Sequence, residues 1–337
     1  MSAGASLPRG EYRTGHFSED EMWSAFAYLF SPKAKHSASY KYGFLKSILD
    51  NLYNTDENLR LTFDQLFSKF AEIYWNLVLK HHIRQNIPGK EGKSTKLEQA
   101  LWDTKNKYMI DEGIPFESLT DEMNLYVCRR VKQGCKENVV GALYGDLQEL
   151  FYSFDKKGEW IQINPVMYEF VCKHKTAIEK LNYYEWAKYL EKINDDNVMD
   201  HLLTKIDESA KRNNLSYYRN ILFEEFEKKC FYCGKELTEK SVHVDHFIPW
   251  SFIKDDNLWN FVLACPKCNV SKNDKLASET DLSLLIDRNK SILIQRHNMA
   301  AMKNYQESRL VKIYAWARSN GYKDIWTPPG RKEKLNA

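Results

Sequence analysis

The apolar positions in the first part of the chain repeat with the period of a helix. Apolar side chains stand at positions 40, 44, 45, 48, 49 and 52, and a second series stands at 63, 66, 67, 70, 73, 74, 77 and 78. This spacing gathers apolar residues on one side of a helix. Thr62 and Gln65 have the capping-box spacing at the start of the second series. The pattern predicts two amphipathic helices here, further helices near 95–110 and 120–133, and a shorter one near 141–153.

Polar stretches interrupt this pattern. Residues 85–95 contain a proline, two glycines and several charges, which predicts a loop. Residues 154–164 have the composition of a turn that leads into a short strand. Asn164 and Pro165 then suit the cap and the first turn of a helix that we expect to continue to about residue 193.

A second polar break, at residues 193–198, is the candidate domain boundary. A long helix is expected from about residue 198, with a candidate break at Asn213–Asn214, and the helical pattern returns over residues 289–319. The end of the chain has no periodicity. The interpretation is therefore a helical N-terminal domain of residues 1–195, a second domain of residues 196–325, and a flexible tail of residues 326–337.

Composition and charge place the chain among ordinary folded proteins. Of its 337 residues, 43% are hydrophobic and 28% are charged, which argues against a fibre or a disordered chain. The net charge of +3 is too small to indicate nucleic-acid binding by itself, so any basic surface must be local. No segment has the apolar length of a signal peptide or a membrane span, which favours a cytoplasmic protein.

Four of the seven cysteines form two C-x-x-C pairs, Cys230 with Cys233 and Cys265 with Cys268. Each pair can present two thiolates to one cation, and two pairs complete a four-sulfur site without an open coordination position. The spacing therefore predicts a structural zinc ion. Unrelated cysteines and a thioredoxin-like redox pair are the alternatives, and the second of these lacks a βαβ context.

The sequence HVDHFIPW, residues 243–250, lies between the two pairs and alternates like a strand. Alternation points Asp245 and His246 to opposite faces, so that one can face a metal ion and the other a water molecule. Asn260 lies in a short segment that is expected to form a helical turn. Asn269 follows the last cysteine directly, so a zinc ion would fix its position relative to the strand.

Taken together, these residues resemble the HNH endonuclease family. The matching pattern is C-x-x-C, DHFIPW, an asparagine and CPKCN, followed by a lysine, over about residues 225–290. It is similar to the HNH domain of RNA-guided CRISPR effectors and to stand-alone bacterial nucleases of restriction and anti-phage defence systems. The helical pattern predicts a mainly α protein, and the resemblance adds a small α+β nuclease module. In that module a ββα-metal HNH domain stands on a four-cysteine zinc frame and is followed by C-terminal helices.

The resemblance also implies roles for the matching residues. His246 would be the general base, which suits the ordinary pKa of histidine. Asp245 and Asn269 would hold a catalytic Mg²⁺ or Mn²⁺ ion, and Asn260 would orient the loop next to His246 through backbone hydrogen bonds. The expected activity is metal-dependent hydrolysis of DNA.

The DNA contacts and the biological setting follow less directly from the residues. Lys272, Lys267 and Lys275 are the candidate phosphate contacts, and Lys272 is the first choice. A non-catalytic zinc module that binds nucleic acid or a partner protein is one alternative, and an RNase is another. The N-terminal half carries no motif, so DNA recognition, partner docking and regulation all stay open for it.

Overall fold

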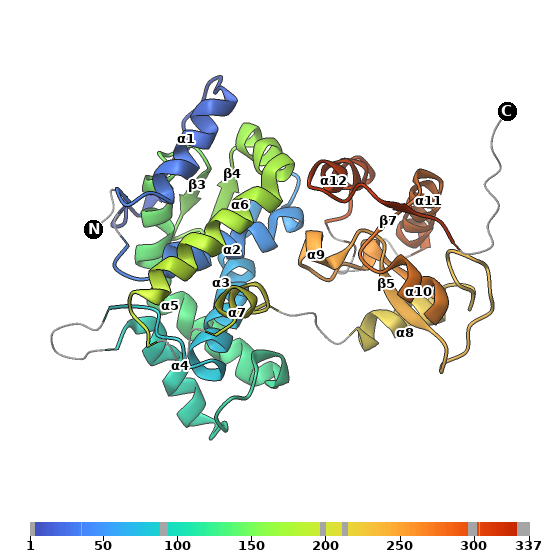
Figure 1. Cartoon of the computed structure of the whole chain (residues 1–337), viewed down its shortest axis with the longest axis horizontal. Helices are drawn as coiled ribbons and strands as arrows, with labels where there is room; N and C mark the ends of the chain where they lie inside the picture. The colour runs from blue at the N-terminus through green and yellow to red at the C-terminus, as the bar shows by residue number, and fades with distance from the viewer. Residues whose placement is uncertain are drawn as a thin grey trace. The chain divides into compact units, whose positions relative to one another are not determined.

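The computed structural model divides the chain into two compact units, residues 1–211 and residues 212–337. It describes residues 4–34, 36–87, 94–195, 200–210, 215–295, 302 and 304–328. The predicted boundary at residue 195 falls inside the first unit, because helix α7 (Leu202–Asp207) packs against helix α6 (Pro165–Glu191). The side-chain amide of Asn76 also donates to the backbone carbonyl of Ser209 at 2.9 Å. Figure 1 shows the order of the elements along the chain.

The first unit is mainly helical, as the apolar pattern predicts. Its remaining long helices are α1 (Glu19–Leu29), α2 (Tyr40–Asp50), α3 (Phe63–Trp75), α4 (Lys96–Lys107) and α5 (Asp121–Asp146). The capping box predicted at Thr62 and Gln65 is present at the start of α3, and Asn164 caps α6 with Pro165 in its first turn. The caps therefore fix where these helices begin.

Helix α5 differs from the prediction of two shorter helices over the same region. It runs without a break through Gly134 and Gly141, and both glycines allow close packing. A Cβ atom on Gly141 would lie 2.0 Å from the carbonyl oxygen of Gly4, and one on Gly134 would lie 3.2 Å from Cβ of Lys96. These glycines therefore serve contacts between segments and do not end the helix.

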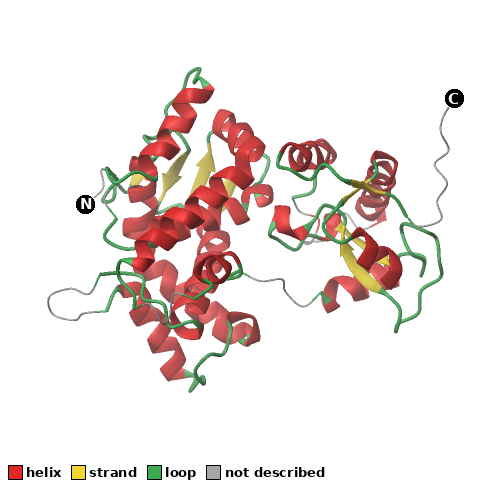
Figure 2. Ribbon diagram, in the orientation of Figure 1, coloured by secondary structure: helices red, strands yellow, loops and turns green. Residues whose placement is uncertain are grey.

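The first unit also contains a four-stranded antiparallel sheet that the sequence analysis largely missed. Its strands are β1 (Arg9–Gly10), β2 (Arg60–Thr62), β3 (Tyr152–Asp155) and β4 (Trp160–Ile163), in the order β1-β3-β4-β2. Only the region of β3 and β4 was expected to hold a strand. The strands β1 and β2 have two and three residues, too few for an alternating pattern to appear. Figure 2 shows these strands among the helices of the unit.

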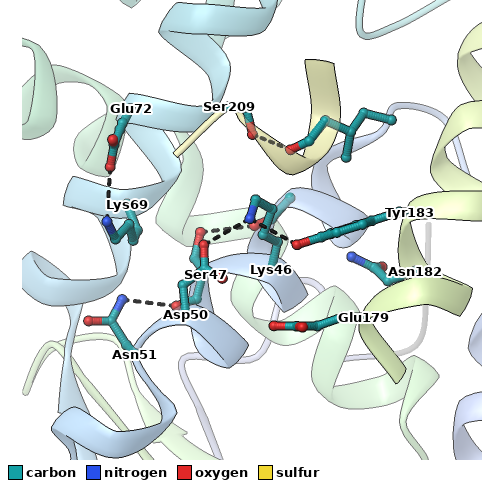
Figure 3. Close-up of polar contacts among 12 residues, drawn as sticks. Lys46, Ser47, Asp50, Asn51, Lys69, Glu72, Glu179, Asn182, Tyr183 and Ser209 are labelled. Atoms are coloured by element: carbon teal, nitrogen blue, oxygen red, sulfur yellow. Dashed lines mark hydrogen bonds and ion pairs between the residues drawn. The ribbon is translucent and has the colours of Figure 1, made fainter. Parts of the chain in front are cut away.

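A buried polar cluster joins α2 to α6 inside the first unit. The Lys46 ammonium lies 3.0 Å from Oδ2 of Asp50 and donates to the Tyr183 hydroxyl at 3.0 Å. In Figure 3, Lys46 points toward both of these partners. Lys175 and Glu179 form a second buried ion pair on α6. Because buried charges are stable only when they are paired, this cluster ties the two helices to each other in one register.

The second unit holds the segment with the candidate chemistry. Its elements are α8 (Ser216–Glu225), β5 (His243–His246), α9 (Trp250–Ile253), a 3₁₀ turn (Leu258–Asn260), β6 (Phe261–Ala264), α10 (Pro266–Lys272), β7 (Leu276–Ala277), α11 (Glu279–Gln295), α12 (Glu307–Ser319) and β8 (Ile325–Trp326). Strands β5 and β6 pair in an antiparallel ladder and α10 packs on β5, which gives a ββα unit. Strand β8 pairs in parallel with β7, so the chain returns to the region that follows α10.

Two helical predictions for the chain beyond residue 198 are corrected in extent. The predicted helix from residue 198 is replaced by the short helices α7 and α8, and its candidate break at Asn213–Asn214 lies outside the described residues. The helix predicted over residues 289–319 is two helices, α11 and α12. The tail from residue 329 onward also lies outside the described residues. No described helix is both long and apolar enough to cross a bilayer.

Candidate active site and zinc centre

The four paired cysteines converge in the second unit. The Sγ atoms of Cys230, Cys233, Cys265 and Cys268 all lie within 4.8 Å of one another, and within the described part of the chain they are the only such group of three or more His, Cys, Asp or Glu side chains. A Zn–S bond of about 2.3 Å puts the sulfurs of a tetrahedral site about 3.8 Å apart. The Sγ atoms of Cys233 and Cys265 lie 3.8 Å apart. The residues therefore fit a tetrahedral zinc site with four cysteine ligands.

Local backbone geometry forms the two knuckles that hold these cysteines. Gly234 has a φ of +72°, a left-handed conformation that glycine adopts without strain, and this lets the first knuckle turn. The Phe231 amide donates to the carbonyl of Leu263 at 2.8 Å, which fixes this knuckle to β6. The second knuckle forms the N-terminus of α10, where Cys265 is the capping residue. A bound zinc ion would therefore join the strand and the helix of the ββα unit.

His246 is the last residue of β5 and is almost fully buried. Its Nε2 atom lies 2.9 Å from Oδ1 of Asp256, and its ring packs edge-on against Phe261, its partner on β6. A carboxylate accepts a hydrogen bond from Nε2–H, and that tautomer leaves the lone pair on Nδ1. Because the described hydrogen bond uses Nε2, Nδ1 is the ring atom that can face a water molecule.

Asp245, the preceding residue, has a separate set of partners. Its Oδ2 atom accepts from the Tyr232 hydroxyl at 2.5 Å and lies 3.0 Å from Nζ of Lys272. Both contacts involve the same oxygen, so Oδ1 accepts no hydrogen bond from the described residues. A carboxylate oxygen that accepts no hydrogen bond is a suitable ligand for a hard cation such as Mg²⁺.

The position of Lys272 contradicts the prediction that it contacts a DNA phosphate. Its side chain is 0% exposed, paired with Asp245, and its ammonium donates to the backbone carbonyl of His246 at 2.7 Å. A residue held in this way faces the interior of the ββα unit. The prediction rested on its place three residues after Asn269, and a lysine at such a position is normally exposed. Lys267 and Lys275 are exposed, so the phosphate contacts predicted for them stay open.

Asn269 lies one helical turn before Lys272 on α10, facing the same strand. Its side-chain nitrogen lies 3.0 Å from Nδ1 of His243, which is exposed and precedes Asp245 by two residues on β5. With the amide nitrogen used in this contact, the Asn269 oxygen is available as a ligand. Asp245 and Asn269 therefore both belong to the interface between β5 and α10, where Asp245 pairs with Lys272 and Asn269 contacts His243.

Asn260 is fully buried in the turn before β6 and fastens the loop after His246. Its side-chain Oδ1 accepts from the Ile248 amide at 2.8 Å, and its Nδ2 donates to the Ile248 carbonyl at 2.9 Å. Its backbone carbonyl accepts from the Phe247 amide at 2.7 Å. From α11, Arg288 donates to the Phe261 carbonyl at 2.6 Å and Asn289 donates to the Trp259 carbonyl at 2.9 Å. The Asn260 turn is thus held by α11 and in turn holds the segment after His246.

Sequence reasoning missed two residues of this site, Asp256 and Tyr232. Asp256 could have been noticed as a carboxylate ten positions after His246, across the α9 turn. Tyr232 lies between the first two cysteines, and no local pattern indicates that its hydroxyl reaches Asp245. The pKa of Tyr232 is raised well above its usual value, first by burial and then by the Asp245 charge, so the phenol stays protonated and donates.

Comparison with known proteins agrees with this geometry. Residues 230–278 match the model of the HNH endonuclease family, and this segment contains both cysteine pairs, the β5–β6 ladder and α10. No curated protein and no solved structure is significantly similar to the chain. The segment of residues 230–278 therefore belongs to the HNH endonuclease family, a family of nucleases.

Proposed function

We propose that the chain is a metal-dependent DNA endonuclease in which His246 is the general base. The observation that carries this proposal is the 2.9 Å contact between Nε2 of His246 and Oδ1 of Asp256. His246 directly follows Asp245, the proposed metal ligand. An ionised Asp256 accepts from Nε2–H, holds the ring in one orientation, and stabilises the imidazolium that forms when Nδ1 takes a proton. Asp245 and Asn269 would bind the Mg²⁺ or Mn²⁺ ion through oxygen atoms.

The reaction is hydrolysis of one phosphodiester bond. His246 removes a proton from a water molecule, and the water oxygen bonds to phosphorus while the bond from phosphorus to the 3′ oxygen breaks. A bound divalent ion would neutralise charge on the phosphate and stabilise the departing 3′ oxygen. The products would be a 5′-phosphate and a 3′-hydroxyl, which takes its proton from solvent. Asn260 contributes indirectly, because its hydrogen bonds to Ile248 hold the loop that follows His246.

Exposed lysines flank α10 and suit a nucleic-acid backbone, and the family resemblance is the reason to propose DNA as the substrate. Lys267 lies in the first turn of this helix and Lys275 follows its end, so both can contact backbone phosphates without reading sequence. One active site cuts one strand, so a double-strand break would require two sites or two binding events. A role in anti-phage defence or restriction rests on the family resemblance, and plaque counts on cells that carry wild type or His246→Ala would test it.

Relaxation of supercoiled plasmid tests the enzymatic proposal. Wild-type protein is incubated with Mg²⁺, with Mn²⁺ or with EDTA, beside His246→Ala, Asp256→Asn and His243→Ala. We expect metal-dependent cutting that falls by about 10²–10⁴-fold in His246→Ala, the range for a general base. The fall in Asp256→Asn should be smaller, because the base itself remains. His243→Ala removes the hydrogen-bond partner of Asn269 and leaves the base intact, so its rate should fall mainly at low Mg²⁺ and recover at saturating Mg²⁺, unlike that of His246→Ala.

Other outcomes have specific meanings. Cutting that survives in His246→Ala would refute the assignment of the base. DNA binding without cutting in any metal would favour the non-catalytic zinc module. Parallel digestion of RNA and DNA of one sequence separates a DNase from an RNase, and faster cleavage of RNA would contradict DNA as the substrate.

A further inference from the structure

Asp245 is held by two side chains, one from the first cysteine knuckle and one from the helix that begins at the second. Tyr232 lies in the first knuckle, between Cys230 and Cys233, and Lys272 ends α10, which begins at the second knuckle. Both contact the same carboxylate oxygen, Oδ2, at 2.5 Å and 3.0 Å. Two contacts to one oxygen fix the rotation of the carboxylate about χ2, and this orientation leaves Oδ1 without a described partner.

Burial and packing fix the position of the Tyr232 ring that makes this contact. The side chain is 3% exposed and its ring packs edge-on against Trp326 of β8, with centroids 5.0 Å apart. Its backbone is fixed as well, because the Gly234 amide closes the knuckle by donating to the Cys230 carbonyl at 2.9 Å. A zinc ion on the cysteines would hold this backbone in place, so the position of the hydroxyl depends on the zinc centre.

We propose that Tyr232 is a positioning residue that aims Oδ1 of Asp245 at the catalytic cation and thereby couples the zinc centre to the metal site. The inference rests on the proposed function, because it requires Asp245 to be a metal ligand. Hydrogen-bonded partners of metal ligands typically change metal affinity by about 10–100-fold when they are removed. Tyr232 acts through Asp245 and needs no contact with substrate.

Tyr232→Phe tests this proposal, because it removes the hydroxyl and keeps the ring that packs on Trp326. Binding of Mn²⁺ to the full-length, zinc-loaded protein is measured by electron paramagnetic resonance of the free ion, without DNA. We expect the dissociation constant for Mn²⁺ to rise about tenfold or more, with zinc content unchanged. In plasmid cleavage, the Mg²⁺ concentration for half-maximal rate should rise by a similar factor, whereas the rate at saturating Mg²⁺ should change less.

Tyr314→Phe is the matched control for loss of a buried tyrosine hydroxyl in the same unit. The hydroxyl of Tyr314 donates to the carbonyl of Ala277 at 2.6 Å and does not contact Asp245. It should lose a similar amount of stability and keep the wild-type affinity for Mn²⁺. An equal weakening in both variants would mean that Tyr232 serves only stability, and would overturn the proposal.

Asp245→Asn separates failure of this inference from failure of the proposed function. If Asp245→Asn removes Mn²⁺ binding while Tyr232→Phe binds like wild type, the metal site stands and the positioning role is refuted. If Asp245→Asn binds Mn²⁺ like wild type, Asp245 is not a ligand, and the metal site and the positioning role both fall. If Asp245→Asn loses binding and Tyr232→Phe weakens it, the positioning role is supported.

Discussion

Replacing Lys272 with methionine gives a direct test of the ion pair at the centre of the ββα unit. Methionine keeps most of the volume of the buried stem and removes the ammonium, so the packing of α10 on β5 should be preserved. The carboxylate of Asp245 then loses its charge partner, and the carbonyl of His246 loses its donor. Both losses occur at the junction of β5 and α10.

The expected size of the effect follows from the distances. Two unit charges 3.0 Å apart attract by about 5.5 kcal/mol at an effective dielectric constant of about 20. Part of this attraction offsets the cost of removing the ammonium from water, and that cost disappears in the variant. Deleting one partner of a buried pair typically lowers stability by about 3–5 kcal/mol. Because Asp245 keeps its hydrogen bond from Tyr232, we expect a loss near the lower value.

Native-state hydrogen exchange of the β5 and β6 amides is the appropriate assay, because the chain has two compact units and a single melting temperature would mix them. A loss of about 3 kcal/mol corresponds to exchange roughly 150-fold faster at these amides. Saturating Mg²⁺ should slow exchange more in the variant than in wild type, because a cation beside Asp245 would replace the lost ammonium.

Lys267→Met is the matched control for this experiment, since Lys267 lies on the same helix but is exposed. Its exchange rates should equal those of wild type. The reasoning is refuted if Lys272→Met also exchanges like wild type. If Lys272→Met reduced the salt dependence of DNA binding by about one phosphate contact, the predicted contact between Lys272 and a DNA phosphate would be correct.

The remaining predictions concern the zinc centre and a half-buried histidine of the first unit. Cys265→Ser removes one of four zinc ligands and the cap of α10, so we expect loss of zinc and rapid proteolysis of residues 212–337, measured by metal analysis and digestion. A variant with full zinc content and wild-type resistance would contradict a structural zinc site with four cysteine ligands. Burial, with a smaller contribution from the Lys41 charge, lowers the pKa of His36 from 6.5 to about 4. Its contribution to stability is therefore complete above about pH 6.5 and is lost as the pH falls toward 4, by up to about 3 kcal/mol. Native-state hydrogen exchange of the α2 amides in wild type and His36→Gln from pH 7 to pH 4 measures this difference within the first unit, and parallel pH profiles would contradict it.

The parts of the fold that were predictable are those encoded by local spacing. Helix α3 was expected from its apolar period and from the capping box at Thr62, and α6 was expected from Asn164 and Pro165. The sheet of the first unit was not predictable in the same way, because its outer strands β1 and β2 are very short. They are defined by pairing with β3 and β4, about 100 residues or more away along the chain, and no local pattern records such partners.

The residues of the candidate site also divide into those that local spacing predicts and those that depend on distant partners. The four cysteines, and the turn at Asn260, were recognisable because spacing alone sets their geometry. The error at Lys272 arose because its burial depends on Asp245, a residue on another element. A lysine next to a zinc knuckle is expected at the surface unless a carboxylate is known to face it.

Tyr232 is a second residue whose role its local sequence does not predict. Its neighbours in sequence, Cys230 and Cys233, assign it to the zinc knuckle, whereas its hydroxyl belongs to the environment of Asp245. One short segment therefore serves two centres, and sequence spacing identifies only the first. A buried phenol that donates to a carboxylate must be positioned closely, because an unpaired hydroxyl or carboxylate at that depth would cost free energy. The zinc knuckle can supply that positioning, so the cysteine spacing constrains the site around Asp245 as well as the metal that the cysteines themselves would bind.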